Sequence, residues 1–330
     1  MNEEYVIQMK GIRKIYPNGV VANQDVDLNV RKGEIHALMG ENGAGKSTLM
    51  KMLFGLEQPT EGEIYVNGEK VHLSSPNVAI SKGIGMVHQH FMLVPSLTVA
   101  ENIVLGMTPK KNGIFIDRQK AIKITEEYSK KFNLAVDPNA RVVDIPVGMK
   151  QKVEILKALV RGAKILILDE PTAVLTTQET TELFKELKHL KEQGYTLIFI
   201  SHKLNEIMEI TDRLSILRGG KFMGVYETKD VTPEKISRLM VGRDVVLQVQ
   251  KDAAKPTDEI LRVRDLHYVN DWGKKMLNGV SLSVRKGEIL GIAGVEGNGQ
   301  KELVDMLFGL NKPNEGTIAM KGDNIIGLNQ

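Results

Sequence analysis

Unbroken apolar runs alternate with amphipathic segments along the first 245 residues of the chain. The runs in EIHALMG (34–40), KILILDEP (164–171) and TLIFISH (196–202) are typical of parallel strands buried on both faces. The segment TTQETTELFKELKHLKEQG has apolar residues at helical spacing and ends at Gly194, which predicts an amphipathic helix. This alternation predicts an α/β fold with a parallel sheet and with functional sites at the carboxyl ends of its strands.

A long internal repeat organises the chain. Residues 26–68 align with residues 280–322 at a constant offset of 254, with 22 identities in 43 positions and no gap, so we infer a duplicated domain. We expect the first copy over residues 1–245, a polar linker over residues 246–257 and the second copy over residues 258–330.

The second copy stops early relative to the first. Gln330 corresponds to position 76 of the first copy, and the later part of the first copy has no counterpart in the printed chain. The chain is therefore either part of a longer protein or the product of a short gene. A 73-residue piece of a larger sheet buries its apolar face poorly when it is alone.

The composition excludes several classes of protein. No apolar run approaches the roughly 18 residues of a membrane-spanning helix, and the polar, acidic N-terminus is no signal peptide. The absence of cysteine excludes disulfides and thiolate metal sites and fits a reducing compartment. The net charge is +3, without a basic block that stands out, so no nucleic acid partner is expected.

The segment GENGAGKST (40–48) follows the first apolar run and precedes a helical pattern. Gly40, Gly43 and Gly45 allow a tight turn with inward N–H groups, and the helix that follows adds a positive dipole end that favours an anion. Lys46 supplies a charge for the β- and γ-phosphates, and Ser47 supplies a hydroxyl for Mg²⁺. We therefore predict a phosphate-binding loop rather than a simple turn between strand and helix.

Two acidic residues end the second apolar run. Asp169 can hold Mg²⁺ through water, and Glu170 can orient an attacking water molecule. An acidic pair before a proline is common by itself. A phosphate-binding loop 124 residues upstream favours a functional role for both carboxylates.

These motifs, in this order, resemble the ATP-binding cassette (ABC) ATPases, and the resemblance covers essentially all of the first copy and the beginning of the second. Gln89 in GMVHQHFML stands where the family has its Q-loop glutamine, which contacts Mg²⁺ and the permease. His202 in FISHKL matches the switch histidine at the γ-phosphate, and Tyr16 in IRKIYPNG matches the aromatic residue that stacks on adenine. Each of the three has a plain structural interpretation alone, but their joint order and spacing favour the functional one.

The resemblance implies a P-loop NTPase fold in which a RecA-like parallel sheet core carries an antiparallel β subdomain and an α-helical subdomain. Residues 1–245 would form the first nucleotide-binding domain, and residues 258–330 the N-terminal part of a second, degenerate one. ATP is expected to contact Tyr16, Gly40, Glu41, Asn42, Gly43, Ala44, Gly45, Lys46, Ser47, Thr48 and Gln89. Mg²⁺ is expected at Ser47, Gln89 and Asp169, and the expected catalytic residues are Lys46, Glu170 and His202.

His88 and His90 flank Gln89, and such an alternating pair could suggest a metal site. No carboxylate or third ligand lies near them in the sequence. Roles in a loop or an interface are therefore favoured over metal binding.

Two positions in the first copy depart from the family pattern. The LSGGQ signature reads IPVGM at residues 145–149, and Pro146 lacks both the hydroxyl and the N–H group of the serine that binds the γ-phosphate across a domain interface. Proline still suits the first turn of the helix that follows. Thr176 replaces an aspartate in a loop that links the two sites, although the sugar and nucleoside branch accepts threonine there.

The second glycine loop, GVEGNGQKE (294–302), keeps its glycines but has Gln300 at the position of Lys46 and Lys301 at that of Ser47. Loss of one preorganised donor costs roughly 2.7–4 kcal/mol, so we expect weak nucleotide binding there. In the family, each nucleotide lies between the P-loop of one domain and the signature of another. The resemblance therefore implies one working ATP site and one degenerate site, in which the second loop would pair with the Pro146 signature.

The segments LTVAENIVLG, EPTAVLT, LMVGR and GIAGVEGNGQ resemble the ATPase subunit of simple-sugar and nucleoside importers, with a nucleoside favoured over a ribose-type sugar. This implies a peripheral subunit at the cytoplasmic face of the membrane, with transmembrane permease subunits and a substrate-binding lipoprotein as partners. The alternatives are a cassette ATPase of ribosomes or DNA and a nucleotide-binding fragment that does not hydrolyse ATP. We expect little ATPase activity from the 330-residue chain alone.

Overall fold

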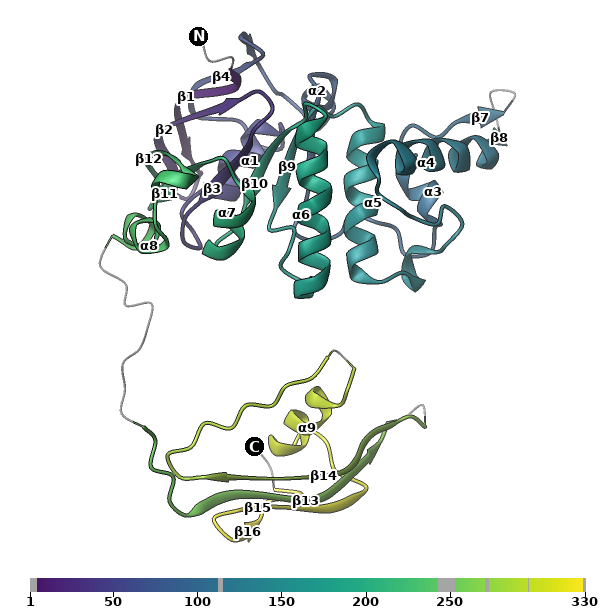
Figure 1. Ribbon diagram of the computed structural model, residues 1–330, viewed down its shortest axis with the longest axis vertical. Coiled ribbons are helices and arrows are strands. Elements are labelled where there is room, and N and C mark those ends of the chain that lie inside the picture. The colour runs from purple at the N-terminus through teal and green to yellow at the C-terminus, as the bar shows by residue number, and fades with distance from the viewer. Residues whose placement is uncertain (1–4, 112–114, 243–252, 271–272, 296, 329–330) are drawn as a thin grey trace. The chain divides into compact units, whose positions relative to one another are not determined.

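The computed structural model describes residues 1–330 except residues 1–4, 112–114, 243–252, 271–272, 296 and 329–330. Contacts within the chain divide it into two compact units, unit 1 over Met1–Leu247 and unit 2 over Gln248–Gln330 (Figure 1). Residues 246–252 of the expected linker lie outside the described residues. Each unit is therefore described by itself.

Unit 1 is built on one sheet of ten strands. Their order is β5 (Glu69–Val71), β4 (Glu61–Val66), β1 (Tyr5–Ile15), β2 (Val21–Arg31), β12 (Lys221–Glu227), β11 (Arg213–Arg218), β3 (Ile35–Met39), β10 (Thr196–Ile200), β9 (Ile165–Asp169) and β6 (Ile84–Val87). The strands from β11 to β6 run parallel to one another. The strands β1, β2, β4 and β5 pair antiparallel, so the sheet has a parallel core beside an antiparallel part.

The unbroken apolar runs are explained by two separate cores, one on each face of the sheet. Along β10, Leu197 and Phe199 belong to one buried cluster, whereas Ile198 and Ile200 belong to the other. Successive side chains of a strand point to opposite faces, and both faces of this sheet are covered by a core. Every residue of β3, β9 and β10 is therefore buried. The expected parallel strands are thus confirmed.

Helices pack on both faces of the sheet (Figure 1). One core includes residues of α1 (Lys46–Leu53) and α2 (Pro76–Ser81); the other includes residues of α3 (Val99–Ile103), α4 (Arg118–Phe132), α5 (Val147–Val160), α6 (Thr177–Glu192), α7 (Leu204–Ile210) and α8 (Pro233–Val241). A short ribbon of β7 (Lys110–Lys111) and β8 (Phe115–Ile116) lies between α3 and α4 in the chain. The expected amphipathic helix is α6, which a capping box at Thr176 begins and after which Gly194 takes a φ of +83°.

Unit 2 repeats the first elements of unit 1 at the same offset of 254 residues. Its elements are β13 (Glu259–Val269), β14 (Lys275–Arg285), α9 (Gln300–Leu307), β15 (Glu315–Met320) and β16 (Asp323–Asn324), with the sheet order β14-β13-β15-β16. The first four correspond residue for residue to β1, β2, α1 and β4. Residues 289–293, the counterpart of β3, form no strand, and only six residues make up the buried core of the described part of this unit.

Among the described residues, every helix falls short of the length and apolar character that a bilayer span requires.

Candidate functional site

The glycine loop connects the carboxyl end of β3 to α1, at the edge of the sheet that the sequence predicts for a site. Gly43 and Gly45 have φ angles of +82° and +93°, a region that favours glycine. A Cβ atom at Gly40 would lie 2.4 Å from the carbonyl oxygen of Leu217, and one at Gly45 would lie 2.4 Å from that of Ala22. The loop is therefore enclosed between the backbones of β11 and β2, and a larger residue at either glycine would displace it.

Lys46 is the first residue of α1, and its ammonium group folds back over the loop. Its Nζ donates to the carbonyl oxygens of Gly40 at 2.7 Å and Glu41 at 3.0 Å. Burial lowers the pKa of Lys46, whereas the nearby carboxylates of Glu170 and Asp169 act in the opposite direction. The loop thus surrounds a buried cation with inward-facing backbone groups.

Asp169 ends β9 beside this cation. Burial raises the pKa of Asp169, and the negative charge of Glu170 raises it further, whereas Lys46, Lys51 and a hydrogen bond from the Ser47 hydroxyl lower it. Ser47 is exposed at the start of α1. The structure therefore places the expected hydroxyl and carboxylate ligands of Mg²⁺ against each other.

Glu170 is held between side chains from two other loops. Gln89 Nε2, after β6, donates to Glu170 Oε2 at 3.2 Å, and His202 Nδ1, after β10, lies 2.9 Å from Glu170 Oε1. Glu170 also has a φ of +48°, which is uncommon for a residue other than glycine and marks a backbone held by its surroundings. Three residues that are far apart in the sequence thus meet at the carboxyl ends of neighbouring parallel strands.

The other residues that are expected to contact ATP differ in their exposure to solvent. Asn42 is exposed, Ala44 is buried and Thr48 is half-buried. Tyr16 is half-buried in the turn between β1 and β2, with Lys14 Nζ 5.2 Å from its ring centroid. Among the described contacts, none joins Tyr16 to the glycine loop.

Two residues that the sequence did not indicate support the site. Asn23, fully buried in β2, donates from Nδ2 to the Gly45 carbonyl at 3.3 Å. Glu206, buried in α7, accepts from the hydroxyls of Thr172 at 2.7 Å and Ser201 at 3.0 Å. Thr172 follows Glu170 and Ser201 precedes His202, so Glu206 ties together the two loops that carry them.

The signature segment forms the expected helix. Pro146 is the N-cap of α5, whose residues Val153, Leu156 and Val160 are buried. The Gly148 N–H group donates to Glu179 Oε1 at 3.3 Å.

The same Glu179 carboxylate also joins the start of α6. Its Oε2 accepts from the N–H and hydroxyl groups of Thr176, both at 2.9 Å. Hydrogen bonds from Thr176 lower the pKa of Glu179. The pattern Thr-x-x-Glu predicts the cap of α6, but only the structure shows that the same carboxylate reaches α5.

The histidines beside Gln89 have different surroundings. The ring of His88 packs edge-on against Phe54 with centroids 6.1 Å apart, and burial lowers the pKa of His88, whereas His90 is exposed. Within the described part of the chain, no three His, Asp or Glu side chains converge as a metal site.

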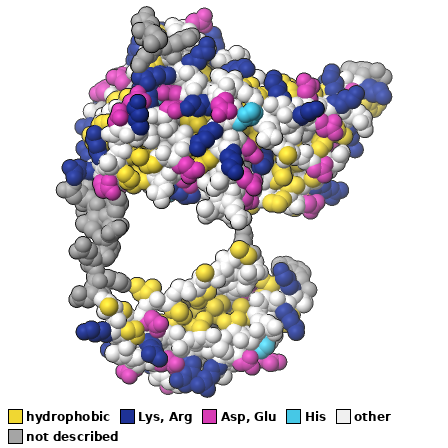
Figure 2. Space-filling model, viewed as in Figure 1, with side chains coloured by type: hydrophobic (Ala, Val, Ile, Leu, Met, Phe, Trp, Pro, Cys, Tyr) yellow, Lys and Arg dark blue, Asp and Glu magenta, His cyan; other side chains and the backbone are white. Residues whose placement is uncertain are grey.

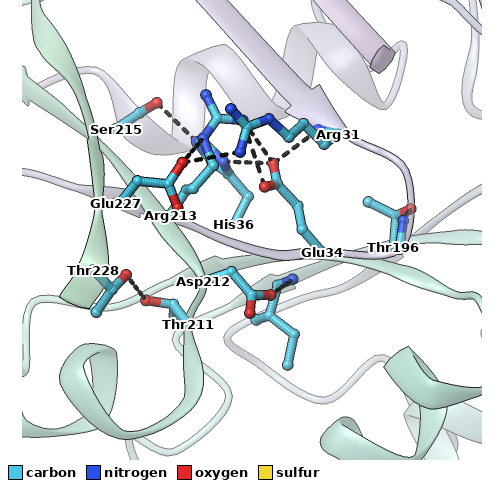
Figure 3. A network of polar contacts seen from close by, with 12 residues as sticks. Arg31, Glu34, His36, Thr196, Thr211, Asp212, Arg213, Ser215, Glu227 and Thr228 are labelled. Carbon is cyan, nitrogen blue, oxygen red and sulfur yellow. Dashed lines mark hydrogen bonds and ion pairs between the residues drawn. The ribbon is translucent and has the colours of Figure 1, made fainter. Parts of the chain in front are cut away.

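A buried polar network lies at the opposite end of the parallel strands (Figure 3). His36, fully buried in β3, contacts Glu34 at 2.9 Å and Ser215 at 2.8 Å, and Arg213 lies 3.3 Å from the same Glu34 carboxylate. Buried charges persist when they are paired and hydrogen-bonded. This network therefore fixes the amino ends of β3 and β11, whereas the glycine loop occupies the carboxyl end of β3.

The second glycine loop keeps the turn without the cation. Gly297 and Gly299 have φ angles of +85° and +91°, close to those of Gly43 and Gly45. A Cβ at Gly299 would lie 2.4 Å from the carbonyl oxygen of Met276, the counterpart of Ala22. Gln300 replaces the lysine, so the described part of this loop presents no ammonium group at that position.

Comparisons with known proteins agree with this geometry. The profile of the ABC transporter family matches residues 23–173 and 277–328. The chain is 53% identical over 325 residues to the guanosine import ATP-binding protein NupO of Bacillus subtilis and 49% identical to the nucleoside import ATP-binding protein NupA of Lactococcus lactis; each alignment covers 98% of this chain. The chain spans 63% and 64% of the lengths of these two relatives.

A solved structure with a related fold is the dimeric ATP-binding cassette in a post-hydrolysis state with ADP and phosphate. It superposes with a TM-score of 0.58 at 29% identity, over 67% of this chain and 98% of that one. The profile match and the two sequence relatives extend across both units. The chain therefore belongs to the ABC transporter family.

Proposed function

We propose that the chain binds ATP at the glycine loop of unit 1 and, within a complete transporter, hydrolyses it to drive the import of nucleosides. One observation carries the proposal: Lys46, Asp169, Glu170, Gln89 and His202 converge at the carboxyl edge of the sheet. Similarity to two proteins named for guanosine and nucleoside import supports a nucleoside as the substrate. A ribose-type sugar is the second candidate.

The residues at the site fit Mg²⁺. Asp169 and Glu170 are neighbouring carboxylates, and burial raises the pKa of Asp169, so a bound cation would relieve an unfavourable local charge. Asp169 and the Ser47 hydroxyl supply hard oxygen ligands, which Mg²⁺ prefers, and Gln89 would add a third. Mg²⁺ would neutralise developing charge on the phosphates when it is bound.

The chain's own residues would bind the phosphates and position the attacking water molecule. The amides of the glycine loop and Lys46 would hold the phosphates, because a helix N-terminus and a cation both favour an anion. Glu170, oriented by Gln89 and His202, would position the attacking water molecule. Tyr16, in the β1–β2 turn, would stack on adenine.

A groove of about 230 Å³ between the sheet and α5 is the proposed docking site for a permease segment. Phe54, His88 and Met92 line it, and Glu154 accepts from the Met92 N–H group while Lys157 donates to the Met92 carbonyl. The loop that carries Gln89 is thus fixed to α5 on one side of the groove. A segment bound there would be placed to sense movement of Gln89.

Similarity to two import ATP-binding proteins supports association with permease subunits. We propose a peripheral subunit at the cytoplasmic face of a membrane, with a substrate-binding lipoprotein as a further partner. The test uses the full-length protein with its permease in membrane vesicles. ATP inside the vesicles should drive uptake of labelled guanosine, and Glu170→Gln should retain ATP binding but slow turnover by about 10²–10⁴-fold. ATP-independent uptake, or unchanged turnover in the variant, would reject the proposal, and uptake of ribose alone would assign the sugar.

A further inference from the structure

One short segment of unit 1 is basic, although it contains no long run of lysine and arginine. Residues 107–123 contain five basic residues and one acid, Asp117, which gives them a net charge of +4. The whole chain has a net charge of +3, so all other residues together are slightly acidic. The basic residues are Lys110, Lys111, Arg118, Lys120 and Lys123.

The same segment exposes apolar side chains. Phe115 is 70% exposed, Ile116 62% and Met107 47%. In the two-stranded ribbon, Lys110 lies opposite Ile116 and Lys111 lies opposite Phe115. Because directly opposite residues share a face of a ribbon, each face presents one lysine beside one large apolar side chain.

The lysines of this segment are open to an external partner. The carboxylate of Asp117 caps α4 by accepting from the Lys120 N–H group, and Arg118 lies 3.5 Å from Glu101. Lys110, Lys111, Lys120 and Lys123 are exposed, and among the described residues no acidic side chain forms an ion pair with any of them. In Figure 2, dark blue and yellow side chains gather at the corner of unit 1 that carries β7 and β8.

We propose that Lys110, Lys111, Phe115 and Ile116, with Met107 and Lys120, form a surface that binds anionic lipid headgroups; we call it the basic ribbon. Lysines near an anionic bilayer gain attraction from its negative surface potential, and neighbouring apolar side chains enter the boundary between headgroups and acyl chains. A nucleic acid would satisfy the lysines and could stack on Phe115, but it would leave Ile116 and Met107 in water. The combined apolar and basic character therefore favours a membrane surface.

The basic ribbon is also connected to the groove proposed for the permease. The guanidinium of Arg161, which lines that groove, donates to the carbonyl of Leu105, two residues before Met107. This connection rests on the proposed function, because a permease at the groove would hold this side of unit 1 against a membrane. Binding to lipid vesicles can be measured without a permease or ATP, so failure of either proposal is recognised separately.

The experiment is cosedimentation of the whole chain with vesicles. One set contains phosphatidylglycerol and phosphatidylcholine in equal amounts, and the other contains phosphatidylcholine alone. The test variants are K110Q/K111Q and F115S/I116S. K185Q/K188Q is the matched control, because Lys185 and Lys188 are exposed on α6 and the loss of charge is the same. Thermal unfolding of each variant confirms that it is folded.

We expect binding to the phosphatidylglycerol vesicles only, with a marked loss in high salt. K110Q/K111Q should weaken this binding about 30-fold, from the attraction of two lysines to an anionic surface, and F115S/I116S should weaken it about tenfold. The control should bind like the wild type. Equal binding to both kinds of vesicle, wild-type binding by the ribbon variants, or tighter binding to duplex RNA at equal phosphate concentration would each overturn the proposal.

Discussion

The two copies of the repeat share 22 of 43 aligned residues but reach different structures. The strands β1, β2 and β4 and the helix α1 return residue for residue in unit 2, and so do the left-handed glycines of the loop. The strand β3 does not return. Ile35 at its start is fully buried, whereas Ile289, the same residue in the same RKGEI context, is 85% exposed.

The difference separates local from long-range determinants. The turn before the strand is local and is conserved between the copies: the Arg31 N–H group donates to Glu34 at 2.8 Å, and that of Arg285 donates to Glu288 at 2.7 Å. The strand β3 instead pairs with β10 and β11, which come from far along the chain. A buried parallel strand therefore forms only where its neighbours exist, because its backbone groups need partners.

The largest expected effect concerns nucleotide binding. Lys46→Ala should weaken Mg–ATP binding by at least about 100-fold, because it removes the cation at the phosphates. Gln300→Ala is the matched control in unit 2 and should have no effect. Isothermal titration calorimetry measures both, and retained affinity in Lys46→Ala would reject the assignment of the site.

Restoring the motif in unit 2 tests whether the motif alone is sufficient for nucleotide binding. The double variant Q300K/K301S restores the lysine and the serine of the motif in unit 2. We expect no second binding site, because in the described part of unit 2 no strand supports that loop. A calorimetric stoichiometry of two would show that the local turn suffices.

Burial of the repeated isoleucine provides the next test. Ile35→Ala should destabilise unit 1 by about 2–5 kcal/mol, as expected for a filled core position, and Ile289→Ala should change unit 2 by less than about 0.5 kcal/mol. Urea denaturation measures both effects. Fluorescence of the only tryptophan, Trp272, follows the unfolding of unit 2, and circular dichroism follows that of unit 1. Similar losses in the two variants would mean that residues 289–293 are packed in solution.

Loss of the link between the catalytic loops should have a smaller effect. Glu206→Ala removes two hydrogen bonds to a buried carboxylate and should cost about 1–3 kcal/mol in the free energy of unfolding of unit 1. Glu209→Ala, at an exposed position of the same helix, should be nearly neutral. If both variants have the same stability in urea, then Glu206 does not fix these loops.

The smallest effect concerns Asp169. Its pKa is raised in the folded chain, mainly by burial and then by Glu170, so the folded state binds this proton more tightly than the unfolded state does. The ionised carboxylate therefore disfavours folding above the ordinary value of 3.8, and the penalty disappears as the pH falls. Asp169→Asn should raise the thermal midpoint of the nucleotide-free chain at neutral pH while it weakens stabilisation by Mg–ATP. A lower midpoint would contradict this electrostatic account.

Much of the site was predictable because its motifs are local. The glycine loop, the acidic pair at the end of β9 and the α6 helix all lie where the sequence predicts them. The resemblance to the family placed Gln89 at Mg²⁺ and His202 at the γ-phosphate, but only the structure showed that both contact Glu170. The role of Glu206 and the network around His36 had no local signal, because each depends on a distant partner: Thr172 lies 34 residues from Glu206, and Ser215 lies 179 residues from His36. Tyr16 remains a prediction.

The sequence by itself determined the elements that depend on neighbouring residues: the turns, the capped helices and the glycine conformations. It also determined which chemical groups each glycine loop carries. Tertiary structure alone decided whether β3 forms, which distant side chains meet at Glu170 and where the basic ribbon is exposed. Local conformations are set by steric limits and by hydrogen bonds within a few residues. Burial and long-range pairing depend on which other segments are present to exclude water.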